Sequence, residues 1–393
     1  MEWHHPHVDR IEPHRRNVIE AIEPIESESI VLSLAGGRVL ARAALARLAA
    51  PPFDCSAMDG YAVRHADVAG PTELALRQVL YAGDSPGSAI VAGEAARIFT
   101  GAPLPPGADA VVREESAELR GGRVFLRHEA RRGENVRFAG EDVAQGGEAL
   151  PAGVRVGPRQ HALLEAVGCQ TLVAHRRPRI ALLSTGDEVV RGRTPDSNGA
   201  ALEGLFKEAF VDVWRGVVAD EPALVRAALV DAVSRADAVV TIGGVSVGEK
   251  DLVAGALVAM GADVRVHGVP MKPGKPFLFA LAGRKPVFGL PGSPSACLVA
   301  FEVFARPAIL RLAGAARIFR PVAWLPLAEG CEGRPGRARF LWAGLDPDGR
   351  VRPVGRDTAQ VRGPALAQAL LRIPEGTGDV PEGERVETWL LGE

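Results

Sequence analysis

Residues 178–314 alternate short apolar runs with helix-forming segments, and this alternation constrains the fold more than any other feature of the sequence. RIALLSTG, ADAVVTIGG and PVFGL have the length and apolar character of buried strands. Between the first two, EPALVRAALVDAVSRA places its apolar residues on one face at helical spacing. This pattern predicts a mostly parallel sheet with helices on both faces. Ligands of such sheets bind at the carboxyl ends of the strands.

The flanking segments have other patterns. Residues 16–48 hold a helical stretch followed by Ala- and Leu-rich sequence that Pro51 and Pro52 would end, which predicts more helix. Residues 53–140 and 315–393 instead contain short β-like runs separated by glycine and proline, which is typical of small β domains.

The composition excludes several classes of protein. The chain has 393 residues, of which 47% are hydrophobic and 24% charged, so it is not disordered throughout. A net charge of −2 argues against a broadly basic nucleic-acid-binding protein. Charged residues or glycine interrupt every apolar run before the roughly 18 residues of a membrane span. The N-terminal sequence lacks the apolar stretch of a signal peptide, so we expect a cytoplasmic protein with no membrane partner.

Loops that carry glycine, acids or lysines follow the predicted strands, so they should converge at one edge of the sheet. One of them contains Gly243, Gly244 and Ser246 ahead of a helix, where free backbone N–H groups suit a phosphate. It matches neither G-x-x-x-x-G-K-[ST] nor G-x-G-x-x-G, and a plain tight turn is the alternative. The other loops at this edge are 184–188, 272–276 and 290–294, together with Asp220 and Asp251.

Three acids at this edge, Glu188, Asp220 and Asp251, would repel a phosphate on the glycine loop. A Mg²⁺ ion would remove that conflict, because it bridges carboxylates and phosphate oxygens. The alternative for Asp220 and Asp251 is that each caps a helix; Ser197 is expected to cap another. Lys272 and Lys275, held between prolines, are interpreted as an anion clamp, with a solvated turn as the alternative.

Eight blocks of this sequence occur in the order of a known family. They resemble the molybdopterin molybdenumtransferase family, the MoeA type that includes the gephyrin E domain. The blocks are PPFDCSAMDGYAVR, TGAPLPPGADAVV, NVRFAGEDV, ALLSTGDEVV, DSNGAAL, TIGGVSVGEKD, MKPGKPF and LPGSPSA.

The resemblance implies an enzyme that inserts molybdate into the dithiolene of adenylylated molybdopterin and releases AMP with the help of Mg²⁺. It implies catalytic roles for Asp59, Thr100, Glu188, Asp220 and Asp251, of which the last three are the candidate metal ligands. Asp142 falls in a matching block and can also be read as structural. The expected substrate-binding residues are Gly186, Asp187, Gly243, Gly244, Ser246, Lys272, Lys275, Pro276 and Ser293.

The resemblance also implies an α/β multidomain architecture. We expect a discontinuous helical domain (1–48 with 141–177), an inserted β domain (49–140), the three-layer α/β domain (178–314) and a C-terminal β domain (315–393). Members of this family are elongated homodimers, and the block around Asp59 is expected to reach a cleft shared between protomers. Molybdopterin adenylyltransferase and acceptor molybdoenzymes are the expected protein partners.

Some residues depart from the family pattern. Ser293 replaces an asparagine, Trp342 replaces an arginine, Gly363 and Pro364 replace a Ser-rich turn, and Gln368 replaces an asparagine. The changes at Trp342 and Gly363 remove a cation and a hydroxyl that would help to hold molybdate. Two alternatives therefore stay open: a molybdopterin adenylyltransferase, whose α/β unit is similar, and a non-catalytic pterin-binding or scaffold paralogue.

Overall fold

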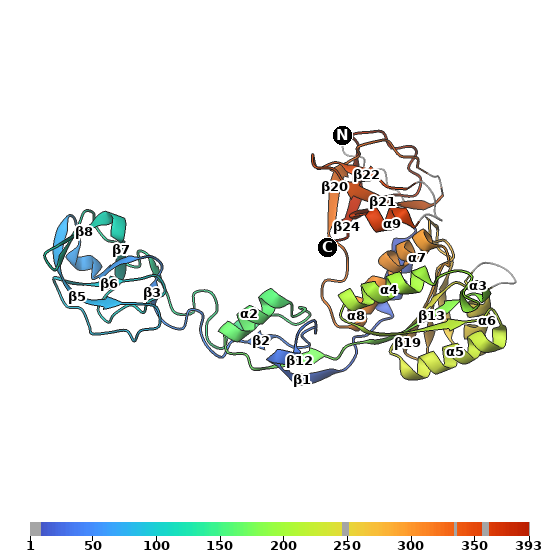
Figure 1. Cartoon of the computed structure of the whole chain (residues 1–393), viewed down its shortest axis with the longest axis horizontal. Helices are drawn as coiled ribbons and strands as arrows, with labels where there is room; N and C mark the ends of the chain where they lie inside the picture. Colours follow the sequence, from blue (N-terminus) through green and yellow to red (C-terminus); the bar gives the residue numbers. More distant parts are fainter. Residues whose placement is uncertain (1–8, 246–250, 334–335, 356–360, 393) are drawn as a thin grey trace.

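The computed structural model describes residues 9–245, 251–333, 336–355 and 361–392. The chain forms an elongated molecule with a larger end and a projecting arm (Figure 1). The larger end contains the α/β domain and the C-terminal domain. The arm consists of a middle lobe (26–50 and 141–177) followed by a distal lobe (51–140). In the described residues, no helix combines the length and apolar character needed to cross a membrane.

The α/β domain is built on a six-stranded sheet in the order β14-β13-β15-β19-β18-β16. The first four strands are parallel, and β18 and β16 continue the sheet antiparallel. The mostly parallel sheet expected from the sequence is therefore present. The strands are β13 (Arg179–Thr185), β14 (Asp212–Val218), β15 (Ala238–Ile242), β16 (Asp263–His267), β18 (Leu278–Ala282) and β19 (Lys285–Leu290).

Helices cover both faces of this sheet because successive side chains of its buried strands point to opposite sides. Ile180 and Leu182 of β13 pack in one core with α4 and α7, whereas Ala181 and Leu183 pack in a second core with α5 and α6. Asp196, rather than the predicted Ser197, caps α4. The helices are α3 (Asp187–Val190), α4 (Ser197–Glu208), α5 (Pro222–Arg235), α6 (Leu252–Ala259), α7 (Pro294–Ala300), the π-helical turn Phe301–Ala305 and α8 (Arg306–Leu312).

The C-terminal domain contains a mixed sheet in the order β17-β21-β23-β24-β20, with β22 paired to β21. Its edge strand β17 comes from the α/β part of the sequence and pairs in parallel with β21. The two domains therefore share a sheet. The elements are β17 (Met271–Lys272), β20 (Val322–Pro326), β21 (Ala338–Leu345), β22 (Val351–Pro353), α9 (Arg362–Leu366), β23 (Ala369–Ile373) and β24 (Arg385–Leu390).

The N-terminal segment differs from the predicted helical stretch. Helix α1 (Glu12–Glu20) packs with the α/β domain, since Val18 and Ile22 belong to that core. The Ala- and Leu-rich stretch after it is not helical: Gly37 has a φ of +76°, and Ala44 and Ala46 are buried around an exposed Leu45, which is the period of a strand. The middle lobe contains β1 (Ser27–Val31), the turn Leu32–Leu34, β2 (Ala44–Leu45), β11 (Glu148–Leu150), α2 (Pro158–Ala166) and β12 (Thr171–His175).

The distal lobe is a small β domain with one six-stranded sheet in the order β7-β4-β6-β5-β9-β8. Its separate core includes Tyr61, Val63, Leu74 and Val124. Short 3₁₀ turns lie at His65–Asp67 and Glu114–Ser116. The strands are β3 (Cys55–Ser56), β4 (Gly60–Val63), β5 (Thr72–Leu80), β6 (Glu94–Ile98), β7 (Ala110–Arg113), β8 (Ala117–Arg120), β9 (Arg123–Leu126) and β10 (Val136–Arg137).

Candidate functional site

Three of the predicted loops meet at the carboxyl edge of the α/β sheet, because β15 lies between β13 and β19. The N–H of Gly243 donates to the carbonyl of Leu290, 2.9 Å away. A Cβ atom added to Gly243 would lie 2.9 Å from Oγ1 of Thr185, and one added to Gly292 would lie 3.6 Å from Cα of Gly243. The loops that follow these three strands are therefore in contact.

Gly243 and Gly244 adopt a conformation that side chains rarely accept, with φ of +82° and +65°. A Cβ on Gly244 would also lie 3.0 Å from Cγ2 of Val253 and 3.1 Å from Oγ1 of Thr185. Both positions thus require glycine for conformation and for space. Such backbone lets a ligand approach the main chain closely. Ser246, predicted in the same loop, lies outside the described residues.

The acids that follow β13 and β14 lie side by side. The N–H of Asp220 donates to Oδ1 of Asp187 (3.2 Å), and the N–H of Asp187 donates to Oδ2 of Asp220 (3.4 Å). Glu221, not Asp220, occupies the N-cap position of α5. The exposed Glu188 folds back over Gly186, where an added Cβ would lie 2.7 Å from Oε1 of Glu188. Asp187, Glu188 and Asp220 thus gather at one end of the edge.

Asp251 has both carboxylate oxygens occupied. Oδ1 accepts the N–H of Ala254 at 3.1 Å and so caps α6, as the capping interpretation predicted. Oδ2 lies 2.7 Å from Nε2 of His267, whose ring is half exposed at the end of β16. His267 was not among the residues predicted for the site. The signal for it in the sequence is its place shortly before residues 272–276, the segment that carries Lys272 and Lys275 and is called the lysine loop below.

The described residues contain no group of three or more His, Cys, Asp or Glu side chains arranged to hold a metal ion. Glu188, Asp220 and Asp251 therefore do not form a complete metal shell by themselves. Mg²⁺ is usually held by one or two carboxylates together with water and substrate phosphates. Glu188 and Asp220, exposed oxygen donors near the glycine loop, fit such a partial shell, whereas Asp251 already has two partners.

The lysine loop lies between the two domains. Lys272 is half buried in β17 opposite Arg339 of β21, and Lys275 is exposed. The carbonyl of Lys275 accepts the N–H of Val269 at 2.9 Å, so its backbone is fixed while its side chain is accessible. A Cβ on Gly274 would lie 3.6 Å from the carbonyl of Ala296 in α7.

The lysine loop is therefore next to the start of α7. Pro276 is half buried at its end, and the exposed Ser293 occupies the N-cap position of α7 without a side-chain cap. The lysines and the candidate anion-binding backbone thus belong to neighbouring segments of one edge.

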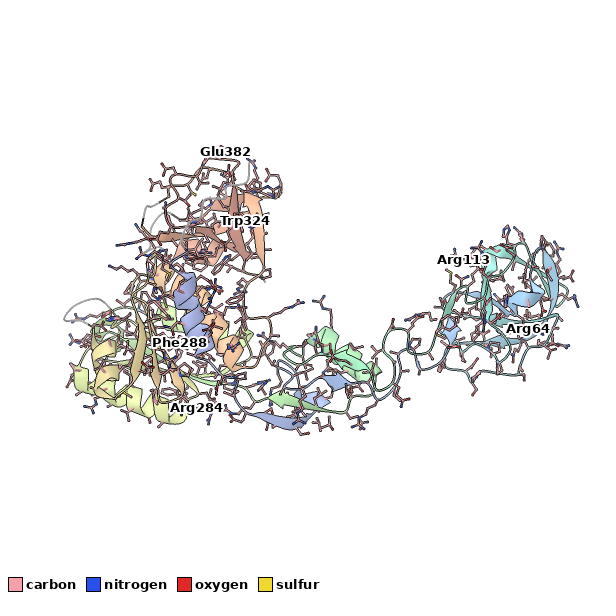
Figure 2. The ribbon with its side chains drawn as sticks, turned by 180° about the vertical axis from the view of Figure 1, so that it is seen from behind. Arg64, Arg113, Arg284, Phe288, Trp324 and Glu382 are labelled. Carbon is pink, nitrogen blue, oxygen red and sulfur yellow. The ribbon has the colours of Figure 1, made fainter. Side chains whose placement is uncertain are left out.

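Asp59 and Thr100 lie together in the distal lobe. Oδ1 of Asp59 accepts both the N–H and the Oγ1 hydroxyl of Thr100, each at 2.8 Å. These hydrogen bonds, the one from the backbone first, hold the pKa of Asp59 below its usual range. Figure 2 shows the distal lobe, marked by Arg64 and Arg113, at the opposite end of the molecule from Phe288 of the α/β sheet. A single chain does not bring this pair to the glycine loop.

Three of the residues that depart from the family pattern, Trp342, Gly363 and Gln368, have a role in hydrogen bonding or close packing. Trp342 is buried and donates through Nε1 to Oγ of Ser295 at 2.9 Å. Gly363 is buried where a Cβ would lie 2.9 Å from the carbonyl of Val354. Oε1 of Gln368 accepts the N–H of Leu345 at 3.0 Å.

Asp142 has a structural partner as well. Its carboxylate pairs with Arg137 at 2.6 Å, and its N–H bonds to the carbonyl of Ala50 where the two lobes join.

Three family models match the chain in order. The MoeA N-terminal region (domain I and II) matches residues 10–168, the probable molybdopterin binding domain matches 181–311, and the MoeA C-terminal region (domain IV) matches 325–391. The first region covers α1 and most of the arm, the second covers most of the α/β domain, and the third covers most of the C-terminal domain.

Curated relatives and solved structures agree with these matches. The molybdopterin molybdenumtransferase of Nostoc is 38% identical over 76% of this chain and 72% of the relative. Molybdopterin molybdenumtransferase 2 of Mycobacterium tuberculosis is 33% identical over 97% of this chain and 99% of the relative. A molybdopterin biosynthesis MoeA protein of Pyrococcus horikoshii OT3 has a TM-score of 0.82 at 26% identity, covering 97% and 99% of the two chains. The resemblance found in the sequence is therefore confirmed, and the chain belongs to the molybdopterin molybdenumtransferase (MoeA) family.

Proposed function

We propose that this protein inserts molybdate into the dithiolene of adenylylated molybdopterin and releases AMP in a Mg²⁺-dependent step. The observation that carries the proposal is that Gly292 lies next to Gly243 at the carboxyl edge, while Gly274 of the lysine loop lies next to Ala296 near the start of α7. This arrangement would give a phosphate-bearing ligand and an oxyanion neighbouring sites. Relatives that match most of the chain are named for this transferase activity.

The two kinds of anion would be held differently. The backbone at Gly243 and Gly244 would take the adenylyl phosphates, because neither residue has a side chain to keep a ligand away from its N–H group. Lys272 and Lys275 would take molybdate, a dianion, through charge-assisted hydrogen bonds. Asp251, fixed by α6 and His267, would present a negative charge in a constant position to the cation that neutralises the phosphates.

Glu188 and Asp220 are the residues that would hold Mg²⁺ here. When bound, the ion polarises the phosphoanhydride and offsets the negative charge of its oxygens. Asp187 orients Asp220 through the two hydrogen bonds between them. The acids of the edge thus support phosphate binding only when the cation is present.

A homodimer would complete the site, because Asp59 and Thr100 belong to the distal lobe, which lies at the far end of the arm (Figure 1). The second chain would bring its distal lobe to the glycine loop of the first. Apolar side chains exposed on the middle lobe support such a contact: Leu34, Leu45 and Leu48 are 67%, 57% and 54% exposed. Molybdopterin adenylyltransferase, acceptor molybdoenzymes and a cytoplasmic location stay predictions from the sequence.

The test is AMP release from adenylylated molybdopterin by the intact protein with Mg²⁺, in the presence and absence of molybdate. We expect release that molybdate stimulates and that chelation of Mg²⁺ abolishes. Formation of the adenylylated compound from ATP and molybdopterin would instead indicate an adenylyltransferase. Tight pterin binding without turnover would indicate a scaffold paralogue. Either result would overturn the proposal.

A further inference from the structure

Trp342 and Ser295 form a buried hydrogen bond between the C-terminal domain and the α/β domain. Trp342 is 8% exposed and Ser295 4% exposed, and Nε1 of the indole donates to the serine Oγ at 2.9 Å. Their positions are 47 residues apart in the sequence. A polar group that is buried in this way is costly to leave without its partner.

Ser295 lies in the first turn of α7, directly after the loop that contains Gly292 and Ser293. That loop touches the glycine turn at Gly243, and the carbonyl of Gly292 accepts a hydrogen bond of 2.7 Å from the side chain of Asn198. A shift of Ser295 would therefore move a segment in direct contact with the candidate phosphate site.

The strand that carries Trp342 also holds the lysine loop. Ala338 and Arg339 of β21 pair with Met271 and Lys272 of β17, and the N–H of Ala338 donates to the carbonyl of Pro270 at 3.0 Å. Ala338 and Trp342 pack in the same core as Cys297 of α7. One strand thus contacts both the lysine loop and the start of α7.

We propose that Trp342 is a positioning residue that fixes the start of α7 relative to the lysine loop, so that the phosphate and molybdate subsites keep a constant spacing. This inference rests on the proposed function. The C-terminal domain would act on the site through an indole N–H bond to Ser295, with no direct contact between Trp342 and molybdate.

Trp342→Phe tests this idea, because phenylalanine keeps an aromatic ring in the core and removes only the donor. We expect the KM for molybdate to rise about 3- to 10-fold, the ratio that loss of one neutral hydrogen bond gives, with a smaller change in kcat. Ser295→Ala should give a similar rise. The double variant should be little worse than either single variant, because both remove the same bond.

Trp389→Phe is the matched control. Trp389 is 5% exposed in the same sheet, and its Nε1 donates to Glu387 of its own strand at 2.7 Å. It should lower the melting temperature as much as Trp342→Phe without raising the KM for molybdate. Equal KM changes in the two variants would show that Trp342 has only a structural role.

A second readout does not depend on activity. The indole N–H resonance of Trp342, identified by its loss in Trp342→Phe, should be protected from hydrogen exchange and should lose that protection in Ser295→Ala. It should also shift when molybdate and AMP are added to the wild-type protein. If Ser295→Ala leaves the exchange protection of the Trp342 indole N–H unchanged, the proposed role of this hydrogen bond is overturned. An intact protein that releases no AMP but keeps this protection would contradict the proposed function alone.

Discussion

The carboxylate of Asp251 bridges two elements of the candidate site: it caps helix α6 through Ala254 and lies 2.7 Å from Nε2 of His267 at the end of β16. The side chain of Asp251 is only 10% exposed. An acid held in this way keeps its position without a ligand. Beside the phosphate site, such a carboxylate would attract the Mg²⁺ ion through its charge from a fixed position.

We therefore expect Asp251→Asn to leave the protein folded and to lower the rate of AMP release about 10- to 100-fold, as for the loss of a group that supports a metal site from its outer shell. Asparagine can still accept the N–H of Ala254, so the cap is kept, while the charge and the carboxylate oxygen that faces His267 are removed. Asp251→Ala should lose the same activity and in addition about 1 kcal/mol of stability. The rate of AMP release and the free energy of unfolding separate the two effects. A folded Asp251→Asn protein with an unchanged rate would show that this acid is only a helix cap.

The contact between the arm and the α/β domain should contribute less to the stability of the protein at low pH. Arg176 pairs with Asp237 through two hydrogen bonds of 2.5 and 2.6 Å and also with Glu26. Burial raises the pKa of Asp237, but hydrogen bonds from Arg176 and Arg179 outweigh burial and hold the pKa below its usual range.

Because the pKa of Asp237 is lower in the folded protein, its contribution to stability is complete above about pH 4. It disappears as the pH falls through the lower pKa of the folded state. Asp237→Asn should cost about 1.5–3 kcal/mol at pH 7 and less at pH 3. Urea unfolding at the two pH values measures this difference. Asp231→Asn, which alters an exposed pair with Arg235, is the control and should change little. An equal cost of Asp237→Asn at both pH values would contradict the prediction.

The α/β domain could be predicted from the sequence because β13, β15 and β19 are apolar runs and α5 places its apolar residues on one face. The meeting of the loops after β13, β15 and β19 follows from the same pattern, since parallel strands end at one edge. The Ala- and Leu-rich stretch 36–48 could not be predicted correctly, because its helix-forming composition is overridden by Gly37 and by alternate burial in the middle lobe.

Contacts between segments that are distant in the sequence could not be predicted either. The pairing of β17 with β21 joins residues that a domain boundary separates in the sequence. The bond from Trp342 to Ser295 and the contact of His267 with Asp251 depend in the same way on how the domains and strands pack. No local pattern marks these partners.

A shared site predicts complementation between two inactive variants. Asp59→Asn alters the distal lobe, and Asp251→Asn alters the α/β domain; each alone should lower AMP release. In a mixed dimer, one site would combine the intact distal lobe of one chain with the intact α/β domain of the other. Random mixing should therefore restore about a quarter of the wild-type activity. Activity of the re-associated mixture is the measurement, and each variant dissociated and re-associated alone is the control. If mixed dimers form but activity does not recover, the site is not shared between the two chains.

Lys275→Ala should weaken molybdate binding selectively. The ammonium group of Lys275 is exposed, while its carbonyl is fixed by Val269, so removing the side chain leaves the loop in place. Loss of one charge-assisted hydrogen bond costs about 1.5–3 kcal/mol, which is roughly a 10- to 150-fold rise in the apparent Kd for molybdate. Pterin affinity should change much less, because Gly243 and Gly244 would hold its phosphates.

Lys207→Ala is the matched control, since Lys207 is an exposed lysine paired with Glu203 on α4. Molybdate dependence of AMP release and direct binding of the pterin compound measure the two affinities. A wild-type molybdate dependence in Lys275→Ala would show that Lys275 is a solvated turn residue, and equal losses for both ligands would place it on a phosphate.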